Sequence, residues 1–192
     1  HLPDTMKKLY SKGHVSIRDG NVSFKPKNSN YFYISAGSVR KDEMTMDQIL
    51  RVYFDKNKNL HYDKNYMYKP SREINMHSFL QTDPVYYGKN TFIVHAHPKN
   101  IISYIGINKH RELKTVMDAF PELNVGRIGR NVKYHEAGSH ALADNCFYNL
   151  IGEEIVGLER HGSLSIGENV DRIFENIETL EYYIGCILNT KE

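Results

Sequence analysis

The run from Thr91 to Pro98 ends in two histidines that are separated by a single alanine. It is apolar and rich in β-branched side chains, which is typical of a buried strand, and Pro98 ends the backbone ladder. Alternate side chains of a strand share a face, so we expect His95 and His97 to point the same way, with Cα atoms roughly 6 to 7 Å apart. Two imidazole nitrogens can bind one ion from that separation. The pattern predicts half of a metal site, although two ordinary polar strand-end residues would look the same.

A catalytic zinc needs about three protein ligands and an open position, and the ligands usually come from separate segments. In one such segment, Pro70-Ser71-Arg72-Glu73 leads into an apolar-periodic stretch, so Glu73 is expected near a helix start. In another, a short strand from Glu154 ends in His161-Gly162. His161 is therefore expected at a junction between strand and turn, where functional sites are common.

Composition limits the class of protein. The chain has 192 residues, of which 40% are hydrophobic and 25% are charged, so it is long enough for one sizeable core. We expect a single domain over residues 1–192. The formal net charge of +2 produces no strong field, and the apolar runs are short and interrupted. Nucleic acid and membranes are therefore not expected as partners.

The two cysteines, Cys146 and Cys186, lie in helical patterns and form no Cys-x-x-Cys pair. This usage predicts buried thiols in a reducing compartment. No signal-peptide pattern stands near His1, so we expect a cytoplasmic protein.

The elements that must position these residues alternate between strand-like and helix-like patterns. We expect strands at residues 14–17, 21–25, 31–34, 51–55, 91–95 and 154–158. We expect a short helix after the capping box at Thr45, and further helices at residues 74–81, 100–107, 111–119 and 140–150. An amphipathic helix from Val170 to Ile187 should dock on the core. This alternation predicts a layered α/β domain.

Several short motifs follow one another in a fixed order: Gly20-Asn21-Val22-Ser23, Ile34-Ser35-Ala36-Gly37, Pro70-Ser71-Arg72-Glu73 with His77, His95-Ala96-His97-Pro98, and His161-Gly162. In this order the chain resembles the class II aldolase and adducin family, which contains zinc-dependent sugar-phosphate aldolases and epimerases. The resemblance spans nearly the whole chain. It implies a three-layer α/β/α fold with a mixed, largely antiparallel central sheet. It also implies a homotetramer with active sites at subunit interfaces.

The resemblance implies one zinc ion per subunit, bound by His95, His97 and His161. Cleavage of a carbon–carbon bond next to a ketone leaves an enediolate, whose negative charge a divalent ion can stabilise as a Lewis acid. Glu73 occupies the position of the family's carboxylate, which binds zinc in the empty enzyme and takes a proton when substrate is bound. His77 follows Glu73 by one helical turn, and we expect it to orient neighbouring side chains rather than to bind metal.

Phosphate binding is implied for a set of turn residues that match the family's cradle: Asn21, Ser35, Gly37, Ser71 and Arg72. Backbone N–H groups in such turns bind anions readily. The chain departs from the family in two ways. Arg72 stands where the family usually has a second Ser, and residues 108–121 contain no Tyr to act as proton donor. Tyr104, His110 and Tyr134 are candidates to replace it, and the donor stays unassigned.

The function expected from these features is cleavage of a phosphorylated ketose resembling L-fuculose 1-phosphate into dihydroxyacetone phosphate and an aldehyde. Glu73 favours an aldolase over the 4-epimerases of the family, which generally have Asp there. A methylthioribulose-1-phosphate dehydratase would use the same zinc ligands and is the main rival enzyme. An adducin-like interaction module is the non-enzymatic alternative, and it would contain no zinc.

Overall fold

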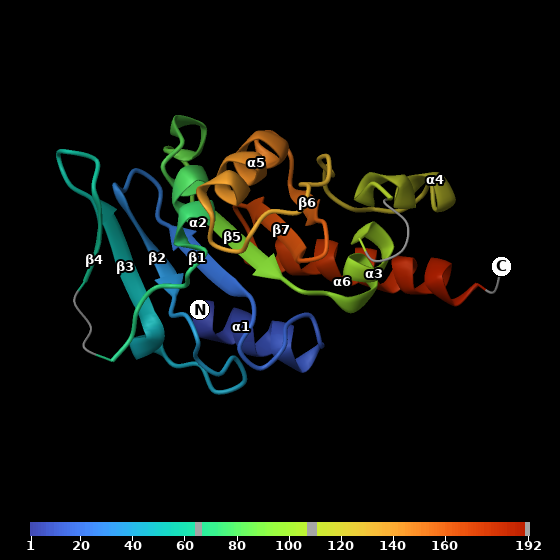
Figure 1. Cartoon of the computed structure of the whole chain (residues 1–192), viewed down its shortest axis with the longest axis horizontal. Helices are drawn as coiled ribbons and strands as arrows, with labels where there is room; N and C mark the ends of the chain where they lie inside the picture. Colours follow the sequence, from blue (N-terminus) through green and yellow to red (C-terminus); the bar gives the residue numbers. More distant parts are fainter. Residues whose placement is uncertain (64–66, 107–110, 191–192) are drawn as a thin grey trace.

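The computed structural model describes residues 1–63, 67–106 and 111–190. Its centre is a seven-stranded sheet in the order β4-β3-β2-β1-β5-β7-β6 (Figure 1). The strands are β1 (Asn21–Lys25), β2 (Tyr31–Ser35), β3 (Ile49–Phe54), β4 (Leu60–Tyr62), β5 (Thr91–Ala96), β6 (Ile155–Leu158) and β7 (Gly162–Gly167). Neighbouring strands pair antiparallel, and two isolated parallel bridges join Ile128 to Ile155 and Val132 to Leu158.

Helices cover both faces of this sheet (Figure 1). The α-helices are α1 (Leu2–Ser11), α2 (Ile74–Gln81), α3 (Lys99–Gly106), α4 (Val116–Ala119), α5 (His140–Leu150) and α6 (Val170–Asn189). Short 3-10 helices are η1 (Met46–Gln48), η2 (Pro84–Tyr86) and η3 (Leu113–Thr115). The three-layer α/β/α arrangement with a largely antiparallel sheet confirms the fold class expected from the sequence.

Alternation along the central strands divides the apolar side chains between two cores. In β5, Val94 and Ala96 pack with α1, α3 and α6, whereas Ile93 packs with α2 and α5. His95 shares the face of Ile93 because side chains two residues apart in a strand point the same way. The histidine side chain is therefore held on the α2 side of the sheet, where it is completely buried.

Most of the expected strands and helices are present with bounds shifted by one or two residues, but residues 14–17 form no strand. His14 and Val15 are both buried, so the inside–outside alternation of a strand is absent. The segment instead contributes single backbone contacts: the His97 N–H donates to the His14 carbonyl at 2.7 Å, and the Lys41 N–H donates to the Ile17 carbonyl at 2.9 Å. The expected strand is wrong because tertiary contacts replace a ladder there.

The helix expected at residues 111–119 is also shorter than the pattern suggested. Only η3 and α4 are helical, because the Leu113 N–H donates to Asn131 Oδ1 and the Asn131 N–H donates to Glu112 Oε2. Ile107, the expected end of the preceding helix, lies outside the described residues. Cys146 is buried as expected, but Cys186 is exposed, so the expectation of two buried thiols is wrong.

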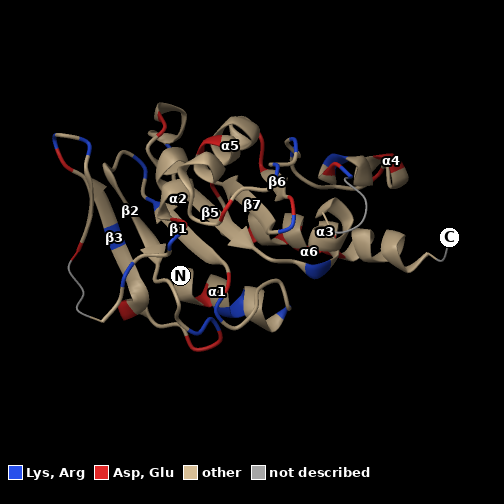
Figure 2. Cartoon of the chain, in the orientation of Figure 1, with Lys and Arg blue, Asp and Glu red and all other residues tan. Residues whose placement is uncertain are grey.

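Four elements were not anticipated: α1, η2, β4 and β7. The omission of β7 matters most, because this strand pairs with both β5 and β6 and brings the His161 turn next to His95. Charged residues of both signs are distributed over the molecule (Figure 2). In the part of the chain that the structure describes, no helix has the length and apolarity that a membrane span requires.

Candidate metal centre

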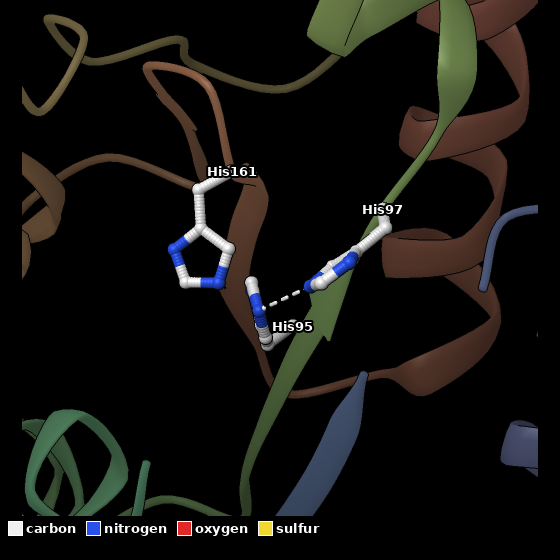
Figure 3. Close-up of side chains that lie close together, drawn as sticks. All are labelled: His95, His97 and His161. Carbon is white, nitrogen blue, oxygen red and sulfur yellow. Dashed lines mark hydrogen bonds between the residues drawn. The ribbon is translucent and has the colours of Figure 1, made fainter. Parts of the chain in front are cut away.

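Three imidazole rings meet at the ends of β5 and of the β6–β7 hairpin (Figure 3). The ring centroid of His95 lies 4.7 Å from that of His97 and 4.7 Å from that of His161. The centroids of His97 and His161 are 5.2 Å apart. One nitrogen of each ring lies within 4.8 Å of the others. The Nε2 atoms of His95 and His97 are 2.8 Å apart. Three nitrogen ligands at such separations can bind one metal ion.

The β6–β7 hairpin places His161. Leu158 pairs with Gly162, and the three residues between them form the turn, closed by a hydrogen bond from the His161 N–H to the Leu158 carbonyl. Arg160 has a φ of 55°, a left-handed conformation that lets so short a turn reverse the chain. The structure thus places His161 in the turn directly before β7, in agreement with the junction expected from the sequence.

Helix α6 fixes the other side of the centre through α3. The Glu181 carboxylate of α6 accepts backbone N–H groups from Asn100 and Ile101 at 3.0 Å. These donors belong to the first turn of α3, where backbone N–H groups lack partners within the helix. Because α3 begins directly after His97 and Pro98, this cap holds the corner that carries His97.

Glu73 lies between the histidine cluster and α2, at the residue before that helix begins. Glu73 Oε2 lies 3.2 Å from His95 Nε2, and Glu73 Oε1 lies 3.2 Å from His161 Nε2. The Asn21 side-chain amide donates to Glu73 Oε2 at 2.9 Å and to Ser71 Oγ at 3.1 Å. The carboxylate therefore faces the same point as the imidazole nitrogens.

The electrostatics of the cluster favour neutral His95 and His97 rings beside an ionised carboxylate. Burial, with added repulsion from His95 and His161, lowers the pKa of His97 to about 3. Burial also lowers the pKa of His95, against the opposing effect of Glu73. Burial alone would raise the pKa of Glu73, but electrostatic interaction with His95 and the hydrogen bonds of His161 and Asn21 keep it below its usual value. Neutral imidazoles and a carboxylate are the forms that bind metal ions.

The tautomer of His95 is fixed by the sheet. Its Nδ1 lies 2.9 Å from the backbone carbonyl of Ser163 in β7, and a carbonyl can only accept. Nδ1 therefore carries the proton, and the lone pair of Nε2 faces His97 and Glu73. This donor set, three imidazoles and a carboxylate, fits zinc.

A cavity of about 240 Å³ opens beside the cluster. Its walls include the side chains of Glu73, His97 and His161. Of the five residues expected to bind phosphate, four also line it: Asn21, Gly37, Ser71 and Arg72. Ser35 is different, because it is fully buried and its Oγ accepts the Val22 N–H at 3.1 Å. The Ser35 hydroxyl holds β1 against β2 and does not line this cavity.

Three charged residues at the cavity were missed in the sequence: Arg18, Asp19 and Lys41. Asp19 Oδ2 lies 3.9 Å from His97 Nδ1, a distance for charge attraction rather than a direct hydrogen bond. Lys41 is almost completely buried, and burial lowers its pKa to about 8 against the attraction of Asp19. Asp19 stands directly before the Gly20-Asn21 motif, and metal-bound histidines commonly have a carboxylate neighbour. Together these two points were the sequence signal that could have identified Asp19.

The candidate proton donors do not meet at this cavity among the described residues. The Tyr104 hydroxyl is 2.9 Å from Thr115 Oγ1, and its ring belongs to the core under α3. Tyr134 is 54% exposed, with the Arg160 guanidinium 4.7 Å from its ring centroid. His110 lies outside the described residues. His77 is fully buried and bonds to Asn21 and Ser23.

Comparison with known proteins agrees with this fold. The family model of the class II aldolase and adducin N-terminal domain matches residues 1–188, so the chain belongs to that family. A relative named L-fuculose phosphate aldolase from Methanococcus maripaludis is 28% identical over 173 residues, which cover 89% of this chain and 81% of the relative.

Two solved structures share the fold. The sugar-phosphate aldolase from Thermotoga maritima superposes with a TM-score of 0.77 at 21% identity, covering 97% of this chain and 91% of that one. The L-fuculose-1-phosphate aldolase from Thermus thermophilus gives a TM-score of 0.69 at 18% identity, covering 97% and 91%. At these identities the two structures establish the fold and leave the reaction to be argued from the site.

Proposed function

We propose that this chain is a zinc-dependent aldolase that cleaves a phosphorylated ketose, L-fuculose 1-phosphate or a similar sugar, into dihydroxyacetone phosphate and an aldehyde. The observation that supports this most directly is the meeting of His95, His97 and His161 with the Glu73 carboxylate at one cavity. The proposal includes one zinc ion per chain and a cytoplasmic location.

The zinc would be held by the three imidazoles, with Glu73 as a further ligand in the absence of substrate. When bound, zinc acts as a Lewis acid that stabilises negative charge developing on the oxygens of a ketose. The polypeptide contributes the orientation of its ligands. The Ser163 carbonyl holds the His95 ring, and Asp19 lies near the outer nitrogen of His97. Such neighbours of metal ligands typically change metal affinity or activity about 10- to 100-fold.

Glu73 is proposed as the base. An aldol cleavage requires a group beside the metal that accepts and returns a proton, and a carboxylate must be ionised to accept one. The contacts with His95, His161 and Asn21 favour the ionised form. The carboxylate lies in the cavity wall, within reach of a substrate that binds there.

The phosphate group is proposed to bind at the part of the cavity formed by Asn21, Gly37, Ser71 and Arg72. The Gly37 N–H donates to the Lys69 carbonyl at 3.0 Å, and the Ser71 N–H donates to the Ser35 carbonyl at 3.3 Å, so the two turns lie side by side. Arg72 can bind a phosphate through two parallel N–H groups. Lys41 and Arg18 add positive charge to the same cavity.

The rival enzymes would use the same metal and form different products, whereas the non-enzymatic alternative would use no metal. A methylthioribulose-1-phosphate dehydratase would release water, a 4-epimerase would release no aldehyde, and an adducin-like module would bind no zinc. We therefore propose to measure metal content first. The purified protein should then be assayed against a panel of ketose 1-phosphates for dihydroxyacetone phosphate release, and against methylthioribulose 1-phosphate for water loss.

Variants test the assigned roles. His95→Ala and His161→Ala should each abolish zinc retention and turnover, because only two of the three imidazoles remain.

Glu73→Gln should retain zinc and lose turnover by about 100-fold or more, since general-base catalysis contributes on that order. His140→Ala is the matched control, because His140 is exposed outside the cavity. Wild-type cleavage by Glu73→Gln would refute the assignment of the base, and zinc-free protein after purification with added zinc would refute the metal centre.

A further inference from the structure

Five buried polar side chains form a continuous series of hydrogen bonds between α2 and β1, and this series ends at Glu73. His77 and Gln81 of α2 follow Glu73, the residue before this helix, at spacings of four residues, so the three side chains share one face. Asn21 and Ser23 are spaced by two residues, so they lie on one face of β1. The five side chains are at most 8% exposed, and Ser23, His77 and Gln81 are fully buried.

The side chains connect alternately across the two elements. Gln81 Nε2 donates to Ser23 Oγ at 2.9 Å, and Ser23 Oγ lies 2.7 Å from His77 Nδ1. His77 Nε2 contacts Asn21 Oδ1. Asn21 Nδ2 then donates to Glu73 Oε2 at 2.9 Å. The path from Gln81 to the candidate base is therefore continuous.

The direction of donation follows from the Gln81 end. Gln81 Nε2 also lies 3.2 Å from the Thr91 backbone carbonyl, which can only accept, so the amide nitrogen must occupy this position. Ser23 Oγ consequently accepts from Gln81, and among the described residues its own proton has an acceptor only when His77 Nδ1 is unprotonated. His77 must then carry its proton on Nε2 and donate it to Asn21 Oδ1.

The Glu73 end gives the same direction independently. The amide nitrogen of Asn21 faces both Glu73 Oε2 and Ser71 Oγ, and its oxygen faces His77 Nε2. That oxygen requires a donor on His77 Nε2. Burial, with repulsion from His95, lowers the pKa of His77 to about 3, so the ring is neutral and carries a single proton.

We propose that Gln81, Ser23 and His77 are positioning residues that act through Asn21, fixing its amide with the N–H groups toward Glu73 and Ser71 and so holding the Glu73 carboxylate at the histidine cluster. Hydrogen bonds that all donate in one direction polarise one another and strengthen the last bond, which here is the one to the carboxylate. The effect on turnover rests on the proposed function; the effect on protonation and metal affinity does not.

The protonation of His77 tests the proposal in the unmodified protein. Nitrogen-15 NMR of the imidazole should show a neutral His77 with Nε2 protonated and Nδ1 unprotonated at neutral pH. A ring protonated on Nδ1, or on both nitrogens, would overturn the proposal. This measurement needs neither substrate nor a variant that folds.

Variants distant from the metal test the effect on Glu73. Ser23→Ala and Gln81→Leu should each lower zinc affinity by about 10-fold, because Asn21 loses its fixed orientation. Ser23→Thr, which keeps the hydroxyl, should restore most of that affinity. Ser165→Ala is the matched control: Ser165 is equally buried, but its Oγ has no hydrogen-bond partner in the described part of the chain.

The kinetic readout separates positioning from binding. In an active preparation, Ser23→Ala should lower kcat with a smaller change in KM. Zinc affinity that falls no further in Ser23→Ala than in Ser165→Ala would overturn the proposal. If the His77 protonation and the zinc affinities are as expected but no ketose phosphate is cleaved, the positioning proposal stands and the proposed function fails.

Discussion

At the scale of single residues, burial decides which protonation states the centre can adopt. His95 is completely buried, and its Nδ1 proton is committed to a backbone carbonyl of β7. His77 is equally buried, and both of its nitrogens have side-chain partners. A charged imidazolium would lose its hydration in these positions, and this cost outweighs the attraction of Glu73, so the neutral form is favoured.

This burial predicts how the stability of the metal-free protein depends on pH. His77 and His97 have pKa values of about 3 in the folded protein against 6.5 for an ordinary histidine. Between these values the unfolded chain binds protons that the folded chain does not. The free energy of unfolding should therefore fall as pH decreases from about 6.5 toward 3. Urea unfolding at a series of pH values measures this slope.

Replacing His77 shows how much of this pH dependence of stability comes from that one side chain. His77→Gln should lower the slope between pH 6.5 and 4.5 by up to about 1.4 kcal/mol per pH unit, the value for one proton. Glu73, whose pKa is lowered from 4.5 in the folded chain, adds to the slope of both proteins at the lower end of this window, so its contribution cancels in the comparison. Ser165→Ala should shift stability without changing the slope. An unchanged slope in His77→Gln would contradict a neutral buried ring.

At the scale of elements, the contact between β5 and β7 holds the cluster together. Ala96 pairs with Ser163, and His95 pairs with Leu164, so the strand end that carries His95 lies against the start of β7. Gly162 stands at this contact. A Cβ atom there would lie 2.2 Å from the Ala96 carbonyl oxygen and 3.1 Å from His97 Cδ2. The glycine is required by the approach of the two backbones.

Gly162→Ala should therefore force the two strands apart at the metal centre. We expect a loss of about 1 to 3 kcal/mol in stability from the overpacking, together with a larger relative loss of zinc affinity. Urea unfolding and metal titration measure the two effects. Gly88→Ala is the control, because a Cβ at Gly88 has no atom within 4 Å. Normal zinc binding by Gly162→Ala would show that the strand contact does not position the rings.

At the scale of the whole molecule, the proton donor of the proposed aldolase is unassigned within the described part of one chain. No tyrosine lines the cavity within residues 1–63, 67–106 and 111–190. Tyr104 is engaged with Thr115, whereas Tyr134 is exposed. A proton donor from a neighbouring subunit would complete the site, in keeping with the homotetramer that the family resemblance implies.

We predict that the protein is a homotetramer in solution and that the assembly is required for turnover. Light scattering after size-exclusion chromatography should give four times the mass of one chain. Dilution that dissociates the assembly should abolish turnover while zinc remains bound, because all three imidazoles belong to one chain. A fully active monomer would contradict the prediction.

Sequence alone was sufficient for features that neighbouring residues encode. The β-branched run at Thr91 to Ala96 forms β5, and the apolar spacing after Asn169 forms α6. The same local rules placed Glu73 directly before α2. They failed at residues 14–17, where backbone contacts with His97 and Lys41 replaced a strand.

Only the tertiary structure decided which side chains meet. The position of α2 beside β1 brings Asn21 to Glu73. The strand order β1-β5-β7 is set by hydrogen bonds between segments far apart in the chain, and this order brings His161 to His95. The tertiary structure also puts the Ser35 hydroxyl in a hydrogen bond within the sheet and places Asp19 beside His97. Side-chain periodicity determines the face on which a residue lies, but strand pairing and helix packing determine its neighbours on that face.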